Sequence, residues 1–307
     1  MKMLHTIENE DWLAKIDSAH GANCVVLRNK KHTAVLLREL PDDGIPDNPY
    51  LYGMPILFPV NRIEGGTFEF EGRKYSFPIN EPRTGCHLHG ELHRQPFALT
   101  AQSTSRGQYR FCAAAGGYLG FPHAFEILQE YVLQSDGFYH TVTVRNLSQQ
   151  NMPVFLGFHT TFQTLLTQGS RPQDVSVFAD ICEEYERNME VNYLPTGRIL
   201  PFDAVSTALA KGDFKPFAEK ISRHYRGRGR MTITDAKKGI RVVYEPDQKY
   251  GFRLIFNGGD EGYICLEPQT CLANCQNAPF EQMESGFDFL RVGESRSYRS
   301  KIYLEEL

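Results

Sequence analysis

The stretch FEILQEYVLQSDGFYHTVTVRNLS, residues 125–148, alternates apolar and polar side chains on both sides of a short turn. Val142 and Val144 carry the alternation on after Ser135-Asp136-Gly137. A period of two residues is typical of a strand with one buried face, and a turn segment between two such runs is typical of a hairpin. The stretch therefore predicts a long antiparallel hairpin.

The same plan recurs along the rest of the chain. GTFEFEGRKYSF (66–77) alternates around a Glu71-Gly72 turn, and residues 239–267 hold at least three short strands separated by Pro, Gly and Asp. Residues 293–307 end the chain with another alternating strand. Short strands with turn residues between them are typical of an all-β sandwich or barrel. We expect an all-β fold, a large antiparallel β-sandwich with little helix.

Signals for helices and linkers are few. Residues 8–16 and 213–225 are each predicted to form one or two helical turns, and Pro216 limits the second to its N-terminal turn. Residues 41–55 are rich in Pro and Gly and are predicted to form a long loop. Because all-β domains often exceed about 200 residues, we expect one domain over residues 1–307.

The composition is that of a soluble globular protein. Of 307 residues, 41% are hydrophobic and 23% are charged, with a net charge of −4. The charges are interspersed and only residues 222–230 are locally basic, so we expect no nucleic-acid partner. We find neither an apolar run of about 18 residues nor a signal-peptide core, so no membrane partner is expected. We therefore expect a cytoplasmic protein whose seven cysteines are reduced thiols.

The densest group of potential metal ligands is TGCHLHGELH (84–93), which holds Cys86, His87, His89 and His93. A catalytic zinc site usually needs three ligands that converge on one point. In a strand, His87 and His89 share one face while Cys86 points to the other. Three cysteines near the C-terminus lack paired CxxC spacing: Cys265, Cys271 and Cys275. We therefore expect no metal and no other cofactor.

Three further segments place a polar side chain among apolar strand positions. The first runs from NRIEGGTFEF (61–70) to CHLHG (86–90) and contains Arg62 and His89. The second is MPVFLGFHTTF (152–162), with His159, and the third is YICLEPQT (263–270), with Glu267. Each residue taken alone has an ordinary structural explanation. A lone buried histidine is more often a hydrogen-bonded core residue than a catalyst, and a single Glu at a strand end can simply be an inward charge.

Together these segments resemble the aldose 1-epimerases, also called galactose mutarotases. YGMPILFPVNRIEGGTFEFEGRKYSF (52–77) followed by HLHG (87–90) is similar to the family's N-terminal pattern of Leu-Phe-Pro, Asn-Arg, a hairpin and Leu-His-Gly. TVTVRNLSQQNMPVFLGFHTTF (141–162) resembles a second block and YICLEPQT (263–270) a third. The three blocks follow the family's order from about residue 50 to residue 280.

The resemblance implies a β-sandwich of the galactose mutarotase type that interconverts the α and β anomers of a free aldose. It implies Glu267 as general base and His159 as general acid, with Arg62, His89 and Asn61 binding the sugar. We expect a small-molecule sugar as the partner, and a monomer or homodimer. His87 and His93 match no family position. Where the family carries an Asp-His pair, the nearest match is Arg223-His224.

The chemistry explains the residue types. Opening the hemiacetal ring requires a base for the proton of the C1 hydroxyl and an acid for the ring oxygen, worth about 10²–10⁴-fold in rate. An unperturbed Glu is ionised at pH 7, whereas an imidazole needs a nearby negative charge to hold its proton. We therefore expect Glu267 within hydrogen-bonding reach of His159, raising the pKa of that histidine.

Two other functions fit the same segments. A hexose 6-phosphate epimerase would need an additional arginine at the site, for which Arg223, Arg226 and Arg228 are candidates. A carbohydrate-binding protein without catalysis would not require an acid and a base beside one bond. Glycoside hydrolysis is disfavoured, because it calls for two carboxylates about 5–9.5 Å apart and only Glu267 stands in a convincing motif.

Overall fold

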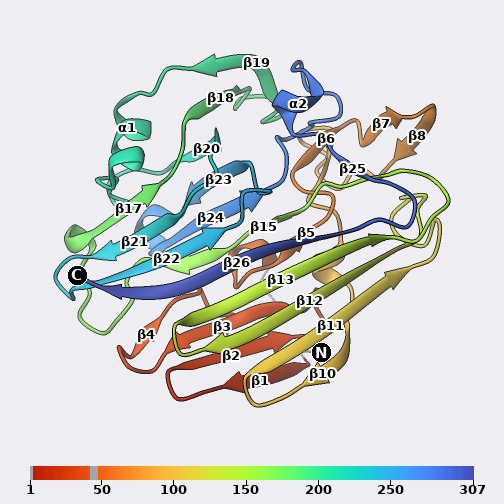
Figure 1. Cartoon of the computed structure of the whole chain (residues 1–307). Coiled ribbons are helices and arrows are strands. Elements are labelled where there is room, and N and C mark those ends of the chain that lie inside the picture. The colour runs from red at the N-terminus through yellow and green to blue at the C-terminus, as the bar shows by residue number, and fades with distance from the viewer. Residues whose placement is uncertain (1–2, 42–47) are drawn as a thin grey trace.

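Two large antiparallel sheets dominate the computed structural model, which describes residues 3–41 and 48–307. Figure 1 shows the long C-terminal strand β26 between β13 and β22 in the first sheet. In spatial order, that eight-stranded sheet comprises β10 (Ala98–Gln102), β11 (Arg106–Ala113), β12 (Phe125–Gln134), β13 (Gly137–Asn146), β26 (Ser295–Glu306), β22 (Ile240–Pro246), β21 (Met231–Asp235) and β17 (Val175–Ala179).

The second sheet carries the candidate site. In order, it comprises β19 (Pro195–Leu200), β18 (Glu183–Arg187), β20 (Ser222–Arg226), β23 (Phe252–Asn257), β24 (Tyr263–Gln269), β15 (Gly157–Phe158) and β5 (Ile56–Leu57), with β16 (Thr161–Gln163) also paired to β24. All seven residues of β24 are buried, because strands flank it on both sides and packed side chains cover both faces.

The two sheets pack face to face through aromatic side chains. Phe162 of β16 lies 5.5 Å from Tyr244 of β22, measured between ring centroids. Phe158 of β15 meets the ring of His140 in β13 edge-on at 4.8 Å. Strand β12 explains how the sequence builds this core, since its residues alternate between buried and half-buried positions from Phe125 to Leu133. The predicted antiparallel β-sandwich is confirmed.

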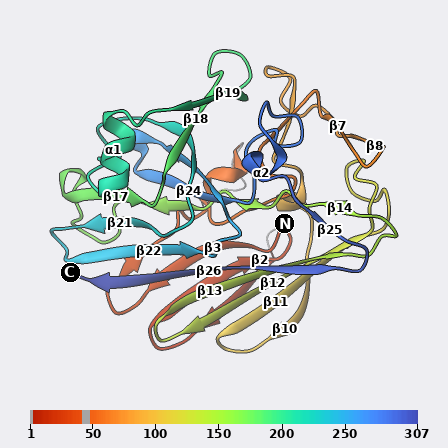
Figure 2. The same cartoon turned by 45° about the horizontal axis from the view of Figure 1, so that its top comes forward.

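Smaller elements complete the fold. They are the N-terminal sheet β1 (Leu4–Glu8), β2 (Trp12–Asp17), β3 (Asn23–Asn29) and β4 (Ala34–Val35); the pairs β6 (Arg62–Glu64) with β9 (Cys86–Leu88), β7 (Thr67–Phe70) with β8 (Arg73–Ser76), and β14 (Met152–Pro153) with β25 (Phe289–Leu290); the helices α1 (Ala204–Lys211) and α2 (Gln282–Ser285); and the 3₁₀ turns Pro49–Leu51, Leu92–Arg94, Pro172–Asp174 and Gly259–Glu261. Figure 2 shows α1, β18 and β19 on the far side of the molecule from β10 to β13.

Most of the predicted strands form. The hairpins within 66–77 and 125–148, the three strands within 239–267 and the C-terminal strand are all present. Of the predicted loop at 41–55, residues 42–47 lie outside the described part of the chain, and Pro49–Leu51 form a 3₁₀ turn. All seven cysteines lie in the described ranges and are free.

Both helix predictions were wrong. Residues 8–16 instead hold the end of β1, a turn at residues 9–11 and most of β2; the Asn9 side chain closes the turn by accepting hydrogen bonds from the Asp11 and Trp12 amides. Residues 213–225 end in β20. Helix α1 lies just before them, where the Asp203 side chain caps the Ser206 amide and Gly212 ends the helix in the left-handed conformation.

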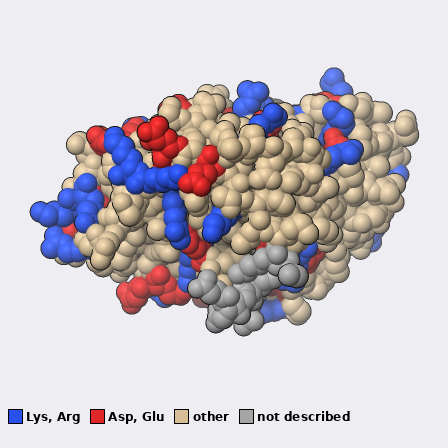
Figure 3. All heavy atoms as spheres, turned by 90° about the horizontal axis from the view of Figure 1, so that it is seen from below, with Lys and Arg blue, Asp and Glu red and all other residues tan. Residues whose placement is uncertain are grey.

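The surface charges agree with the expectation from composition. On the face shown in Figure 3, basic and acidic groups lie beside one another and not in separate patches. Within the described ranges, we find no helix that is long and apolar enough to cross a membrane.

Candidate active site

A cleft of about 430 Å³ opens on the second sheet. Leu254 of β23 and Glu267 of β24 lie directly opposite one another in the sheet and both face the cleft. It is lined by Asn48, Tyr50, Leu51, Asn61, Arg62, Glu81, Arg83, Leu88, His89, His159, Arg187, Met189, Tyr193, Ser222, Leu254, Phe256 and Glu267. All five residues singled out in the sequence are in this set, so the fold brings them to one place.

His159 and Glu267 form a close pair at the cleft. His159 follows β15, where its amide donates to the Pro55 carbonyl, and Glu267 lies in the middle of β24. The Nε2 atom of His159 is 3.2 Å from Oε1 of Glu267. The other carboxyl oxygen, Oε2, accepts a hydrogen bond of 3.1 Å from Gln269. The predicted proximity of the two side chains is therefore met.

Their protonation differs from the sequence-based expectation. Burial raises the pKa of Glu267 to about 8, although Gln269 and the more distant Arg187 act in the opposite direction. Burial also lowers the pKa of His159 to about 4. The expected ordinary carboxylate and raised histidine pKa were wrong, because desolvation penalises both charged forms. Between these two values the pair holds one proton.

Asn61 connects His89 to Glu267 through a chain of hydrogen bonds. The Asn61 amide donates to Nδ1 of His89 at 3.2 Å, which leaves the hydrogen of a neutral His89 ring on Nε2. The Asn61 side chain donates to Oε1 of Gln269 at 3.2 Å, and Gln269 donates in turn to Glu267. The orientation of Glu267 is therefore linked to the backbone that presents His89.

The prediction that His87 and His89 share a strand face was wrong. Strand β9 ends at Leu88, and His89 adopts a left-handed conformation with φ of 62°. The next residue must be glycine, because a Cβ on Gly90 would lie 1.9 Å from the Phe58 carbonyl oxygen. The change of backbone direction places His89 in the cleft while His87 bonds the Pro78 carbonyl at 2.7 Å.

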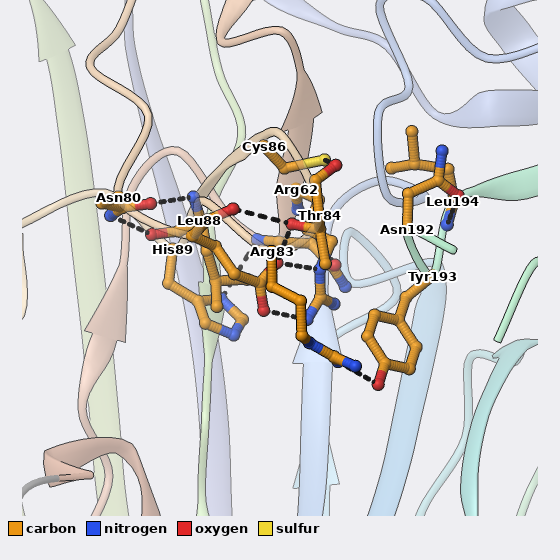
Figure 4. Close-up of polar contacts among 12 residues, drawn as sticks. Arg62, Asn80, Arg83, Thr84, Cys86, Leu88, His89, Asn192, Tyr193 and Leu194 are labelled. Carbon is orange, nitrogen blue, oxygen red and sulfur yellow. Dashed lines mark hydrogen bonds and ion pairs between the residues drawn. The ribbon is translucent and has the colours of Figure 1, made fainter. Parts of the chain in front are cut away.

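Arg62 is held rigidly at the cleft wall. Its Nε and Nη2 atoms each donate to Glu81 at 2.7 Å, and its guanidinium lies 4.6 Å from the centre of the Tyr193 ring. Figure 4 shows Arg83 reaching the Tyr193 hydroxyl and Asn80 bonding the backbone of Leu88. A paired and stacked guanidinium presents its remaining N–H groups in a fixed direction.

Arg187 is a cleft residue that the sequence analysis missed. It ends β18, is 8% exposed, and donates to the carbonyl and hydroxyl of Ser222. Burial lowers the pKa of Arg187 to about 10, so it remains charged at neutral pH. The available signal was the alternation in EEYER, which puts Arg187 on the same face as Tyr185.

A model of one known protein family covers nearly the whole chain. Residues 3–303 match the family model described as aldose 1-epimerase. The chain belongs to the aldose 1-epimerase family. The family resemblance seen in the sequence is thereby confirmed.

Curated relatives of the chain are galactose mutarotases. The protein from Rattus norvegicus is 31% identical over 189 residues, covering 60% of this chain and 52% of that protein. The protein from Pongo abelii is 30% identical over 168 residues, covering 53% and 46%. The matched part thus spans about half the length of these curated relatives.

Solved structures of the same type superimpose over the whole chain. A galactose mutarotase-like protein from Clostridium acetobutylicum gives a TM-score of 0.91 at 27% identity, covering 100% of this chain and 99% of that one. A galactose mutarotase-like protein from Lactobacillus casei gives 0.75 at 17% identity, with coverage of 99% and 100%. At this lower identity the likeness shows the fold alone.

Arg223 and His224, the nearest match to an Asp-His pair in the sequence analysis, do not line the cleft. His224 is fully buried opposite Leu254, and Arg223 is held in ion pairs with Glu184 at 3.1 Å and Asp203 at 2.8 Å. The three arginines suggested for a phosphate do not line the cleft: Arg223, Arg226 and Arg228. That suggestion was wrong, since the arginines at the cleft are Arg62, Arg83 and Arg187.

The His/Cys segment at 84–93 does not converge on one point. His87 bonds Pro78, His89 accepts from Asn61, and Nε2 of His93 accepts from Arg94 at 3.1 Å. Across residues 3–41 and 48–307, one set of three His, Cys, Asp or Glu ligand atoms lies within 4.8 Å, and it belongs to His159, Cys265 and Glu267.

Proposed function

We propose that this member of the family is an aldose 1-epimerase that interconverts the α and β anomers of a free aldose. The observation that carries the proposal is the buried His159–Glu267 pair, whose Nε2 and Oε1 atoms lie 3.2 Å apart in a cleft of sugar size. A general acid and a general base beside one bond are what ring opening requires.

The pair carries the one proton that the reaction needs. In the reactive form, Glu267 is a carboxylate and His159 an imidazolium, and moving the shared proton from Glu267 to His159 produces this form. Glu267 takes the proton of the C1 hydroxyl while His159 gives its proton to the ring oxygen, and the C1–O5 bond breaks. After rotation about C1–C2, the ring closes on the other face. Both protons return and the pair is regenerated.

The remaining cleft residues fit sugar binding. His89 presents its Nε2–H, Arg62 presents fixed guanidinium N–H groups, and Asn61 holds the chain of hydrogen bonds that ends at Glu267. The ring of Tyr50 packs on His89 at 4.8 Å and lies 6.0 Å from His159, so it is placed to contact an apolar sugar face. Donor groups around an apolar platform suit a polyhydroxylated ligand.

One observation favours an aldose phosphate as second candidate. Arg83 and Arg187 also line the cleft, and their side-chain hydrogen bonds go to Tyr193 and Ser222 and not to a carboxylate. With Arg62, three guanidinium groups face the cleft, and Glu81 is the ionised acid that faces it. The cleft therefore carries a net positive charge. Guanidinium groups of this kind bind phosphate well.

Polarimetry on freshly dissolved sugars tests the proposal. We expect wild-type protein to accelerate the decay of optical rotation of α-D-glucose or α-D-galactose, and Glu267→Gln to abolish the acceleration. Acceleration with glucose 6-phosphate but with neither free sugar would favour the second candidate. If the protein binds one of these sugars but does not accelerate the change in optical rotation of any of them, it is a carbohydrate-binding protein instead.

A further inference from the structure

Cys265 lies on the same face of β24 as Glu267. The two residues are two positions apart in one strand, so their side chains project to the same side of the sheet. Cys265 is paired with Phe256 of β23, and Phe256 lines the cleft. The thiol is 0% exposed and contacts the Thr161 hydroxyl at 3.4 Å. The mechanism proposed above gives this thiol no role.

The thiol completes a set of three metal ligands. The ring nitrogen of His159, the sulfur of Cys265 and a carboxyl oxygen of Glu267 all lie within 4.8 Å of one another. Bonds of about 2.0–2.3 Å in a tetrahedral zinc site hold the ligand atoms roughly 3.3–3.8 Å apart. The His159–Glu267 distance of 3.2 Å is already close to this range, so the set closes with a shift of the sulfur by about 1 Å.

A second observation points to a ligand at the same place. Oε1 of Glu267 is buried and makes no hydrogen bond with the described part of the chain, although it lies near His159. The 3.2 Å contact with His159 is not aligned as a hydrogen bond, so this buried oxygen is poorly satisfied, and a cation satisfies it as well as an aligned donor does. His159 and Glu267 also line the cleft, so the three ligands lie next to the space that the sugar would occupy.

We infer that His159, Cys265 and Glu267 form a site for a thiophilic divalent cation, Zn²⁺ above all, that blocks the acid–base pair when it is filled. Imidazole, thiolate and carboxylate are the ligands that zinc takes, whereas Mg²⁺ prefers oxygen alone. The cation bonds the lone pair of His159 and the carboxylate of Glu267 that ring opening needs. Its binding releases the thiol proton and the proton held by the pair to solvent.

The inhibitory consequence rests on the proposed function, but the binding of the cation does not. The experiment therefore has two independent readouts. The first is absorption by Co²⁺, which stands in for Zn²⁺ and gives a thiolate-to-metal charge-transfer band only when a sulfur is bound. The second is polarimetry in the presence of Zn²⁺ or Mg²⁺, with EDTA added at the end to restore activity.

The decisive variant is Cys265→Ser, with Cys24→Ser as its matched control. Cys24 is also a buried strand cysteine, but its thiol bonds the Val26 carbonyl in β3. We expect the cobalt band and zinc inhibition in the wild type and in Cys24→Ser. In Cys265→Ser we expect no cobalt band and unchanged basal activity. Zinc affinity should be at least about 10-fold lower, since losing even a residue that only hydrogen-bonds to a metal ligand lowers metal affinity by about 10–100-fold.

Three results would overturn the inference. They are a wild-type protein that binds Co²⁺ without the thiolate band, a Cys265→Ser variant that binds zinc as tightly as the wild type, and zinc binding through the thiolate that leaves activity unchanged. A protein without epimerase activity still gives the cobalt result, so failure of the proposed function is seen separately. Thermal unfolding of Cys265→Ser, with Cys265→Ala as a second variant, shows that the fold is retained.

Discussion

Two buried histidines on facing sheets of the sandwich, His140 and His159, show what separates a structural group from a chemical one. His140 of β13 is 2% exposed, lies 3.1 Å from Oε1 of Gln129 and stacks on Tyr131 with ring centroids 4.5 Å apart. His159 is 8% exposed and faces a carboxyl group across 3.2 Å. Burial lowers the pKa of both, to about 3 and about 4 respectively.

The difference lies in the partner and not in the histidine. Gln129 cannot exchange a proton, whereas burial raises the pKa of Glu267 to about 8. His159 therefore belongs to a pair that can pass a proton between its members, and His140 belongs to a permanently neutral hydrogen bond. Two titratable groups whose environments push their pKa values apart are the usual mark of acid–base chemistry.

The largest expected effect separates the two histidines directly. His159→Gln should lower kcat for anomer interconversion by about 10²–10⁴-fold, because it removes the proposed general acid. His140→Gln should leave kcat of the folded protein unchanged and lower the free energy of unfolding by about 1–3 kcal/mol, through the lost buried hydrogen bond. Polarimetry and denaturant unfolding on both variants test this. Equal losses of kcat in the two would remove the distinction.

The raised pKa of Glu267 predicts a cost in stability at alkaline pH. The unfolded carboxyl ionises near pH 4.5, but the folded one keeps its proton until about pH 8, so the stability contributed by this proton is lost as the pH rises between these values. Glu267→Gln is permanently neutral and should be more stable than wild type at pH 9, by about 2–5 kcal/mol. Urea unfolding at pH 5 and pH 9, with EDTA present, measures the change. If the difference in unfolding free energy between Glu267→Gln and wild type does not increase from pH 5 to pH 9, the raised pKa of Glu267 is contradicted.

The pH dependence of the reaction sharpens the same comparison. Because the pair holds one proton between about pH 4 and about pH 8, kcat/KM should follow a bell between these limits. Below the lower limit the base is lost, and above the upper limit the acid is lost. The test is to measure polarimetric rates from pH 3.5 to pH 9.5 in EDTA. Outside the bell, kcat/KM should fall by on the order of tenfold per pH unit. His140→Gln should give the same curve, and a curve without an alkaline limb near 8 speaks against Glu267.

The smallest expected effect comes from Gln269. It donates to Glu267 and thereby favours the carboxylate. Gln269→Leu should move the alkaline limb of the pH profile upward by about 0.5–1 unit, since one such hydrogen bond is worth about 1 kcal/mol. Gln129→Leu, beside His140, serves as control and should not move that limb. An unmoved limb in Gln269→Leu would mean that the hydrogen bond does not tune the carboxyl group.

Much of the fold and five residues of the cleft were predictable from the sequence. Strand alternation in 125–148 reflects which side chains face the core, and that choice is local. The family blocks also pointed to Asn61, Arg62, His89, His159 and Glu267, all of which meet at one cleft. Helix α1 was missed although Asp203 and Gly212 supply ordinary cap signals, because its eight residues are mostly small and form no clear apolar stripe.

What the sequence alone determined is the two hairpins, the C-terminal strand, the family and the residue types available for proton transfer, because each depends on side-chain periodicity or on short motifs. What the tertiary structure decided is which of these residues act on one another. It placed Arg187 and not Arg223 at the cleft, and set Cys265 beside Glu267 and His159. It also moved the pKa values of the pair in opposite directions, because burial comes from chain segments more than 100 residues apart, and no local pattern records how they pack.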